Sequence, residues 1–356
     1  MTDPLPVVVT AVGGGALGSQ LMKALRSAST PYRIIGCDVK NESPGLMEAD
    51  ATYLLPFANA PDYCDVLRAV CTRENAKIVL AGSEPEIKRL SGTSMEGLFI
   101  PLNPPNVLDV CFDKVKTMKR VSSLGFRTPR TEWVETIEDL KQIDFFPVVI
   151  KPAVGSGGSA HVYIAQSREE LLAFGSYLLG LAPKTIVQEY VGTPHDEYTV
   201  GVLLSMDGVL VNSIAMLRYL SGAMSVRSAV VNRTGRTELG SSLAVSTGIS
   251  QGFVGAFPEV TRPCESLAEG LGCRGAVNIQ CRMVDGEPWV FEINPRFSGT
   301  TSSRALLGYN EPDVLIRHHV LGEPLLLRFA YNEGLVLRSL KEVVVEAHPT
   351  IGRNLL

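Results

Sequence analysis

The sequence predicts two kinds of fold in succession, an α/β unit at the N-terminus and a longer α+β unit after it. Short apolar segments alternate with helix-like segments up to about residue 107, which is the pattern of parallel βαβ units. Beyond about residue 128 the strand-like segments follow one another closely. Asp-Gly pairs at 207–208 and 285–286 are typical of hairpin turns between antiparallel strands. A length of 356 residues is enough for two or three domains.

The N-terminal unit contains three predicted strands and two predicted helices. The strands are apolar and rich in β-branched residues, whereas the helices place apolar residues at helical spacing. We expect strands at 6–12, 32–39 and 76–82 and helices at 17–25 and 61–73. Two prolines then precede a helical pattern, which predicts a boundary and a linking helix within 103–126.

The second unit is predicted to be mostly antiparallel sheet. Its strands are expected at 146–154, 159–165, 185–191, 197–205, 208–217, 275–284 and 287–295. Residues 221–257 are rich in Gly, Ser and Thr and show little periodicity. This stretch is long for a loop without a function, so we expect a mobile or substrate-covering segment.

The composition argues against several broad classes of protein. The 33 basic and 37 acidic residues give a net charge of −4, which is unlike a protein that coats nucleic acid or anionic membrane. No apolar run approaches the roughly 18 residues of a membrane-spanning helix. The seven cysteines form no CxxC pair, and the first residues lack the basic and apolar regions of a secretion signal. We therefore expect a cytoplasmic protein with reduced thiols that binds neither nucleic acid nor membrane.

The first glycine cluster matches a dinucleotide-binding fingerprint. Gly13–Gly18 satisfies GxGxxG between a predicted strand and a predicted helix, and Asp38 lies at the end of the next strand. In that fingerprint the glycine turn receives a pyrophosphate and the acid holds a ribose. The alternative is a tight turn that needs glycines only for close packing.

The second glycine cluster has a different arrangement. Lys151 ends a predicted strand, and the sequence Gly-Ser-Gly-Gly-Ser at 155–159 follows it before another strand. A Walker loop instead has its lysine after the glycines and a helix behind them. We expect a hairpin tip whose N–H groups close over phosphates, with Lys151 reaching a phosphate oxygen. The alternative is a flexible hairpin beside a solvated lysine.

A third group of polar residues lies within 275–299. Glu292 and Asn294 are two residues apart on a predicted strand and so share one face. Together with Gln280 they would offer three oxygen ligands, which suit Mg²⁺ shared with phosphates and water. Arg296 follows in the next turn, where it can meet an anionic substrate or a transferring phosphoryl group. The alternative is a polar strand edge with a solvated turn.

Convergence of these ligands depends on the length of the hairpin loop. A three-residue loop, 285–287, places Gln280 opposite Glu292, whereas a strict two-residue turn pairs Gln280 with Phe291. The functional interpretation therefore predicts the longer loop.

The order of the motifs along the chain resembles that of the ATP-grasp superfamily. The motifs are, in order, the lysine-rich helix, the Lys-Pro strand with its glycine flap, the QEYV segment and the Gln…Glu-x-Asn-Pro-Arg hairpin. The similarity is closest to the ATP-grasp halves of carbamoyl-phosphate synthase large chains and to stand-alone carboxylate–amine ligases. It implies a Rossmann-like (pre-ATP-grasp) domain at 1–107. A two-lobed ATP-grasp domain would follow, with a small lobe carrying the flap at 108–190 and a large lobe carrying the metal site at 191–356. The glycine turn of this family binds no dinucleotide, which disfavours a dehydrogenase.

The resemblance also assigns roles to individual residues. Residues implied to contact the phosphates of ATP are Lys114, Lys151, Gly155, Ser156, Gly157, Gly158 and Ser159. Those implied to surround adenine and ribose are Gln188, Glu189, Tyr190, Val191 and Glu197. Those implied to hold Mg²⁺, with Mn²⁺ as an alternative, are Gln280, Glu292 and Asn294. Arg296 and Lys151 are implied to be catalytic.

The resemblance implies a two-step reaction. A small carboxylate attacks the γ-phosphate of ATP to give an acyl phosphate and ADP, and an amine then displaces phosphate to form a C–N bond. Alternatives are an ATP-grasp kinase, a carbamoyl-phosphate-synthase-like enzyme and a non-catalytic nucleotide-binding subunit, and the sequence leaves open a homodimer.

Several charged residues are candidates for gripping the substrates. Besides Arg296, the candidates for binding substrate carboxylates bidentately are Arg218, Arg227 and Arg233, which lie in and beside the 221–257 segment. Glu84 and Glu86 follow the third strand of the first unit and could hold an amino group, although a solvated turn is the simpler interpretation.

Overall fold

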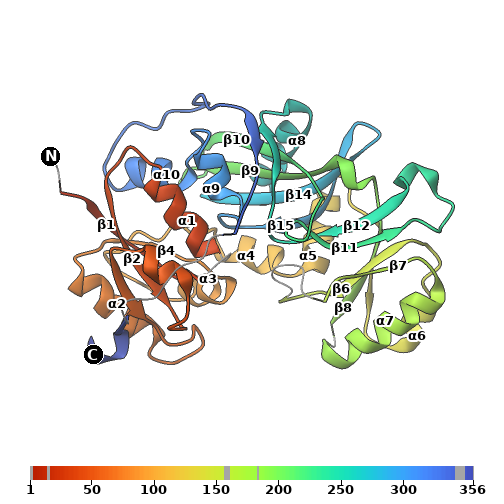
Figure 1. Ribbon diagram of the computed structural model, residues 1–356, viewed down its shortest axis with the longest axis horizontal. Coiled ribbons are helices and arrows are strands. Elements are labelled where there is room, and N and C mark those ends of the chain that lie inside the picture. Colours follow the sequence, from red (N-terminus) through yellow and green to blue (C-terminus); the bar gives the residue numbers. More distant parts are fainter. Residues whose placement is uncertain (1–2, 14–16, 156–160, 183, 341–348, 356) are drawn as a thin grey trace.

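The computed structural model describes residues 3–13, 17–155, 161–182, 184–340 and 349–355 (Figure 1). The predicted fold class is confirmed. A parallel sheet near the N-terminus and a four-stranded antiparallel sheet lie at opposite ends of the molecule, with a six-stranded antiparallel sheet between them (Figure 1).

The N-terminal sheet has the order β17-β3-β2-β1-β4 and all of its pairs are parallel. Its first four strands are β1 (Leu5–Val9), β2 (Tyr32–Asp38), β3 (Ala51–Leu54) and β4 (Ile78–Leu80). Its helices are α1 (Leu17–Arg26), α2 (Tyr63–Arg73) and α3 (Glu84–Ser91), with a 3₁₀ turn at Pro44–Glu48. The edge strand β17 (Thr350–Ile351) pairs with β3, so residues that we had grouped with the large lobe complete the first sheet.

The linking segment forms two helices in place of the single predicted one. They are α4 (Pro105–Cys111) and α5 (Lys114–Ser123). Asp113 interrupts the helical pattern because its side chain accepts hydrogen bonds from the amides of Val115 and Lys116, capping the second helix. The break places Lys114 in the first turn of α5.

The four-stranded sheet has the order β5-β8-β6-β7 and is antiparallel, as predicted. Its strands are β5 (Thr131–Val134), β6 (Val148–Pro152), β7 (Tyr163–Ala165) and β8 (Thr185–Glu189). Helices α6 (Ile137–Lys141) and α7 (Arg168–Leu181) supply the apolar residues that bury one face of this sheet.

The six-stranded sheet has the order β15-β14-β9-β10-β13-β16 and is also antiparallel. Its strands are β9 (Glu197–Leu204), β10 (Leu210–Arg218), β13 (Gly252–Gly255), β14 (Ala276–Val284), β15 (Glu287–Asn294) and β16 (Gly334–Val336). Its helices are α8 (Pro258–Leu271), α9 (Thr301–Ala305) and α10 (Glu311–His319), and 3₁₀ turns lie at Pro194–Asp196, Thr237–Leu239 and Gly352–Leu355.

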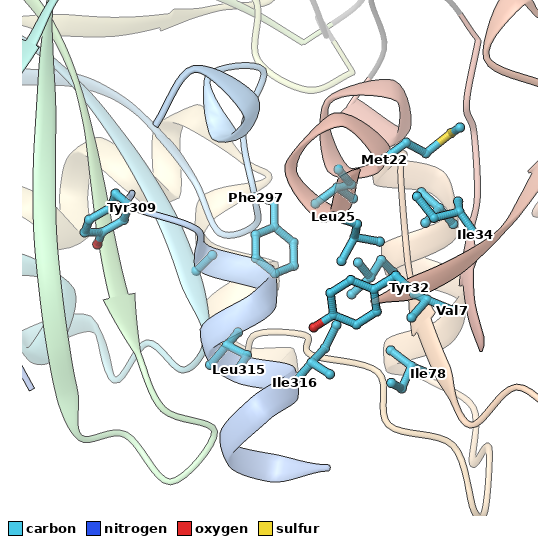
Figure 2. Packing of buried hydrophobic residues seen from close by; sticks show 14 of the residues in the cluster. Val7, Met22, Leu25, Tyr32, Ile34, Ile78, Phe297, Tyr309, Leu315 and Ile316 are labelled. Atoms are coloured by element: carbon cyan, nitrogen blue, oxygen red, sulfur yellow. The ribbon is translucent and has the colours of Figure 1, made fainter. Parts of the chain in front are cut away.

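The N-terminal unit shares a hydrophobic core with the six-stranded sheet. Leu25 of α1 lies beside Phe297 from the C-terminal half (Figure 2), and Met22, Leu315 and Ile316 belong to the same cluster. All five side chains are nearly or fully buried. This contact fixes the carboxyl edge of the parallel sheet against the loops that follow β15.

The 221–257 segment is largely regular structure, and its mobility and its role as a substrate cover stay predictions. The segment contains the hairpin of β11 (Val226–Val231) and β12 (Ser242–Ser246), followed by β13. Side chains of β11 alternate between half-buried and exposed because the hairpin has one solvated face. Interspersed Ser and Arg residues obscured this alternation in the sequence.

All seven cysteines are free and buried. Among the described residues, no helix is both long and apolar enough to cross a bilayer.

Candidate active site

A cleft of about 640 Å³ separates the four-stranded sheet from strands β14 and β15. Predicted site residues that line it are Lys114, Lys151, Gln188, Glu189, Tyr190, Val191, Glu197, Gln280 and Glu292. They come from α5, both antiparallel sheets and the segment after β8. The fold therefore brings together residues from positions 114 to 292 of the chain.

Lys114, Lys151 and Glu292 form one charged group within the cleft. Lys151 is 5% exposed, and its Nζ donates to Oε1 of Gln188 at 2.9 Å. Burial lowers the pKa of Lys151 to about 8. Burial opposes ionisation of Glu292, but the positive charges of Lys114 and Lys151 hold its pKa below the ordinary value. The site therefore holds an ionised carboxylate beside two cationic side chains.

The hairpin of β14 and β15 brings Gln280 opposite Glu292 by a different route from the one predicted. The loop is the two-residue turn Asp285–Gly286, so the predicted three-residue loop is wrong. A β-bulge between Gln280 and Cys281 shifts the register, and Phe291 is the extra residue on β15. The predicted pairing is therefore confirmed, although its cause is the bulge.

Glu292 is the cation ligand that the geometry supports best, because the amide oxygens of Asn294 and Gln280 both accept from arginines. Asn294 Nδ2 donates to Oε1 of Glu292 at 3.0 Å, which places both side chains at one spot. Oδ1 of Asn294 accepts from Arg296 at 3.0 Å, and Oε1 of Gln280 accepts from Arg218 at 3.3 Å. An ionised carboxylate with a neighbouring amide suits Mg²⁺. The amide oxygens of Asn294 and Gln280 each face a guanidinium, so their binding to a metal ion stays a prediction.

Glu197 lies in the cleft wall but is already bound to two arginines. Its Oε1 accepts from Arg218 at 2.9 Å, and its Oε2 accepts from Arg282 at 2.9 and 3.1 Å. All three side chains are buried, and the arginine charges hold the pKa of Glu197 low against the effect of burial. Its contact with a ribose stays a prediction, and most of its hydrogen-bonding capacity is used within the protein.

The three arginines proposed to grip substrate separate in the structure. Arg218 ends β10 and is buried inside the site. Arg227 is an exposed residue of β11, and Arg233 forms an ion pair with Glu170 of α7. Neither lines the cleft or the neighbouring pockets. The residues of the 221–257 segment that do line these cavities are 244–248 and Ser250.

The structure describes the two glycine clusters to different extents. The flap residues Ser156, Gly157, Gly158 and Ser159 lie outside the described residues, whereas Gly155, with φ of +74°, borders the pocket next to the cleft. In the first cluster, a side chain on Gly18 would bring its Cβ to 2.2 Å from the carbonyl oxygen of Thr10. Asp38 accepts from the amides of Gly13, Val39 and Lys40. This turn uses its acid internally and its glycine for close packing.

The structure shows contacts that the sequence did not predict for Arg282, Glu84 and Glu86. Arg282 lies two residues after Gln280 on the same face of β14, a spacing that could have revealed it. Glu84 was expected in a solvated turn, but its Oε1 accepts from Arg296 at 3.1 Å. Glu86 is 5% exposed and accepts from three hydroxyl groups, so it belongs to the interior.

Comparison with protein families decides the interpretation of this geometry. Residues 111–300, which contain the cleft-lining lysines and the β14–β15 hairpin, match the model of the ATP-grasp domain. The chain belongs to the ATP-grasp family. Residues 9–98 match the PylC-like N-terminal domain, in agreement with the parallel sheet that precedes the ATP-grasp region.

Individual relatives agree with this assignment. The carbamoyl phosphate synthase large chain of Mesorhizobium japonicum is 28% identical over 304 residues, which are 78% of this chain and 25% of that protein. The chain thus spans about a quarter of the length of this relative and of the Rhizobium meliloti carbamoyl phosphate synthase large chain. An ADP complex of N5-carboxyaminoimidazole ribonucleotide synthetase has a TM-score of 0.63 at 17% identity, covering 94% of this chain and 80% of that one. An L-amino acid ligase from Bacillus licheniformis has a TM-score of 0.61 at 17% identity, covering 89% and 74%. These structures share the ATP-grasp fold.

Proposed function

We propose that this chain is an ATP- and Mg²⁺-dependent ligase that activates a small carboxylate as an acyl phosphate and joins it to an amine. The observation that carries the proposal is the meeting of Lys114, Lys151, ionised Glu292 and Arg296 along connected cavities. The ligase and synthetase names of the structural neighbours, and the ADP bound to one of them, support it.

The cleft offers a separate place for each part of ATP. The segment Gln188–Val191 borders the apolar end, where backbone groups can pair with adenine. Lys114 and Lys151 lie where they can bind phosphate oxygens. When bound, Mg²⁺ neutralises phosphate charge, and Glu292 and Asn294 would hold it. Mn²⁺ is an alternative ion for the same oxygen ligands.

The proposed chemistry needs no side-chain nucleophile. An oxygen of the substrate carboxylate attacks the γ-phosphorus, the bond to ADP breaks, and an acyl phosphate forms. The amine nitrogen then attacks the acyl carbon and loses a proton, while inorganic phosphate leaves. Arg296 is placed to stabilise the charge that develops on the transferring phosphoryl group. Positioning and electrostatics supply the catalysis.

The first test is the nucleotide product. The purified chain is incubated with MgATP, mixed carboxylic acids and mixed amines, and the products are separated by anion-exchange chromatography. We expect release of ADP that requires an acid, and its loss in Lys151→Met. The matched control is Lys141→Met, an exposed lysine of α6 that pairs only with Glu138. Release of AMP would contradict the proposal.

A further inference from the structure

A polar pocket next to the ATP cleft is lined by residues from β9, β10, β14 and β15 and by the segments at 247–250 and 298–300. Gln280 and Glu292 border both cavities, Arg218 lines the second, and Arg296 lies beside Asn294. Apart from two glycines, every residue lining this pocket has a nitrogen or oxygen in its side chain. Burial of an apolar group here would gain little.

Asn278 presents its amide nitrogen to this pocket. Its Oδ1 accepts from Arg304 Nη2 at 2.7 Å and from the Thr199 hydroxyl at 2.8 Å. A guanidinium only donates hydrogen bonds, so this contact fixes the orientation of the amide. Nδ2 is left without an acceptor among the described residues, although Asn278 is 3% exposed.

Gln280 is oriented in the same way. Its Oε1 accepts from Nη1 of Arg218, again a group that only donates, so its Nε2 has no acceptor in the described part of the chain. Arg218 is 2% exposed, and its Nε also lacks a partner there. A buried donor without an acceptor, such as Nε of Arg218, is rare in folded proteins and calls for a ligand or a water.

One hydroxyl adds to these donors. No hydrogen bond involves the side chain of Ser250 within the described residues, although the residue is 5% exposed and borders the pocket. The pocket therefore combines one buried donor without a partner, Nε of Arg218, with the amide N–H groups of Asn278 and Gln280 and the Ser250 hydroxyl, for which the described residues supply no acceptor. Its only carboxylate is Glu292, at the metal end.

We infer that this pocket binds the acid substrate of the proposed ligase, and that the acid is small and carries hydroxyl or other oxygen substituents instead of apolar ones. The inference rests on the proposed function. The donors of Arg218, Asn278 and Gln280 match the lone pairs of a carboxylate and of neighbouring oxygens. In this arrangement Gln280 donates to the acid, in place of the metal-ligand role that the resemblance implied.

Pairs of acids that differ only by a hydroxyl in place of a methyl group test the inference. Glycerate is compared with 2-hydroxybutyrate, and threonine with valine, using MgATP and hydroxylamine to trap the acyl phosphate as a hydroxamate. A site built to hydrogen-bond a hydroxyl rejects the methyl analogue. Within at least one pair we therefore expect kcat/KM for the acid with the additional hydroxyl to exceed that for its methyl analogue by at least about tenfold. A kcat/KM for the methyl analogues that equals or exceeds that for their hydroxyl partners overturns the inference. The inference is also overturned if neither glycerate nor threonine yields a hydroxamate although ATP still raises the melting temperature. If ATP does not bind at all, the proposed function itself is contradicted.

Two variants separate the roles within the pocket. Ser250→Ala removes a hydroxyl with no bond inside the described chain, so we expect an unchanged melting temperature and ATP affinity but loss of the hydroxyl preference. Gln280→Glu keeps an acceptor for Arg218 but replaces the donor by a second carboxylate. We expect the KM for the acid to rise by at least about tenfold, with Mn²⁺ affinity, measured by electron paramagnetic resonance, unchanged. Tighter Mn²⁺ binding with an unchanged KM for the acid would show that Gln280 is a metal ligand and would overturn its assignment as a donor.

Discussion

The buried ammonium of Lys151 yields a prediction in which stability and function change in opposite directions. Burial lowers its pKa from the ordinary 10.5 to about 8. Carrying the proton at pH 7 therefore costs the folded state roughly 3 kcal/mol. Lys151→Met removes this cost and loses the hydrogen bond to Gln188, worth about 1 kcal/mol. We expect the variant to exceed the wild type in unfolding free energy by about 2 kcal/mol at pH 7, while it loses ATP binding.

Urea unfolding between pH 7 and pH 10 measures this effect. Because the lysine pKa is lower in the folded state, the penalty is full below about pH 8 and fades as the pH rises towards 10.5. The wild type should therefore approach the variant in stability over that range. Lys141→Met, at an exposed ion pair, should change stability by no more than about 0.5 kcal/mol. A variant less stable than the wild type at pH 7, or a difference that does not depend on pH, would refute the reasoning.

Three further predictions follow from the same geometry. ATP binding should raise the pKa of Lys151, so calorimetry in buffers of different ionisation enthalpy should detect proton uptake near pH 8–9; no uptake would place the phosphates away from this lysine. Arg227→Ala and Arg233→Ala should leave the KM values for acid and amine unchanged and cost no more than about 0.5 kcal/mol in thermal unfolding, because both side chains lie on the surface away from the site; a raised KM for either would contradict the placement of the β11–β12 hairpin. Glu197→Gln should reduce the urea unfolding free energy by roughly 3–5 kcal/mol, since it removes the counter-charge of two buried arginines; a neutral effect would mean that these charges are solvated.

Most of the fold could be predicted from the sequence because its signals are local. The alternation of apolar strands and helices at the N-terminus identified β1, β2, β4, α1 and α2. The closely spaced strands after residue 128 identified the antiparallel sheets. Strand β17 was not predictable, because a two-residue strand distant in sequence has no periodicity of its own.

The sequence predicted those features of the site that depend on the order of motifs along the chain. It did not predict those that depend on contacts between different strands and units. The pairing of Gln280 with Glu292 was right, but a bulge at Phe291 produces it, and a bulge changes register without a clear sequence signal. The orientation of the Gln280 amide depends on Arg218, which lies on another strand. The ion pair of Glu84 with Arg296 joins residues of two different units. Neither contact follows from spacing within one element.

The most direct test of the ligase proposal is the fate of a carboxylate oxygen. The reaction is run with an ¹⁸O-labelled acid, ATP, Mg²⁺ and an amine, and inorganic phosphate is analysed by mass spectrometry. An acyl phosphate intermediate predicts one labelled oxygen in phosphate for each C–N bond formed. Phosphate without label, or a phosphorylated hydroxyl product in its place, would contradict the proposal and favour a kinase.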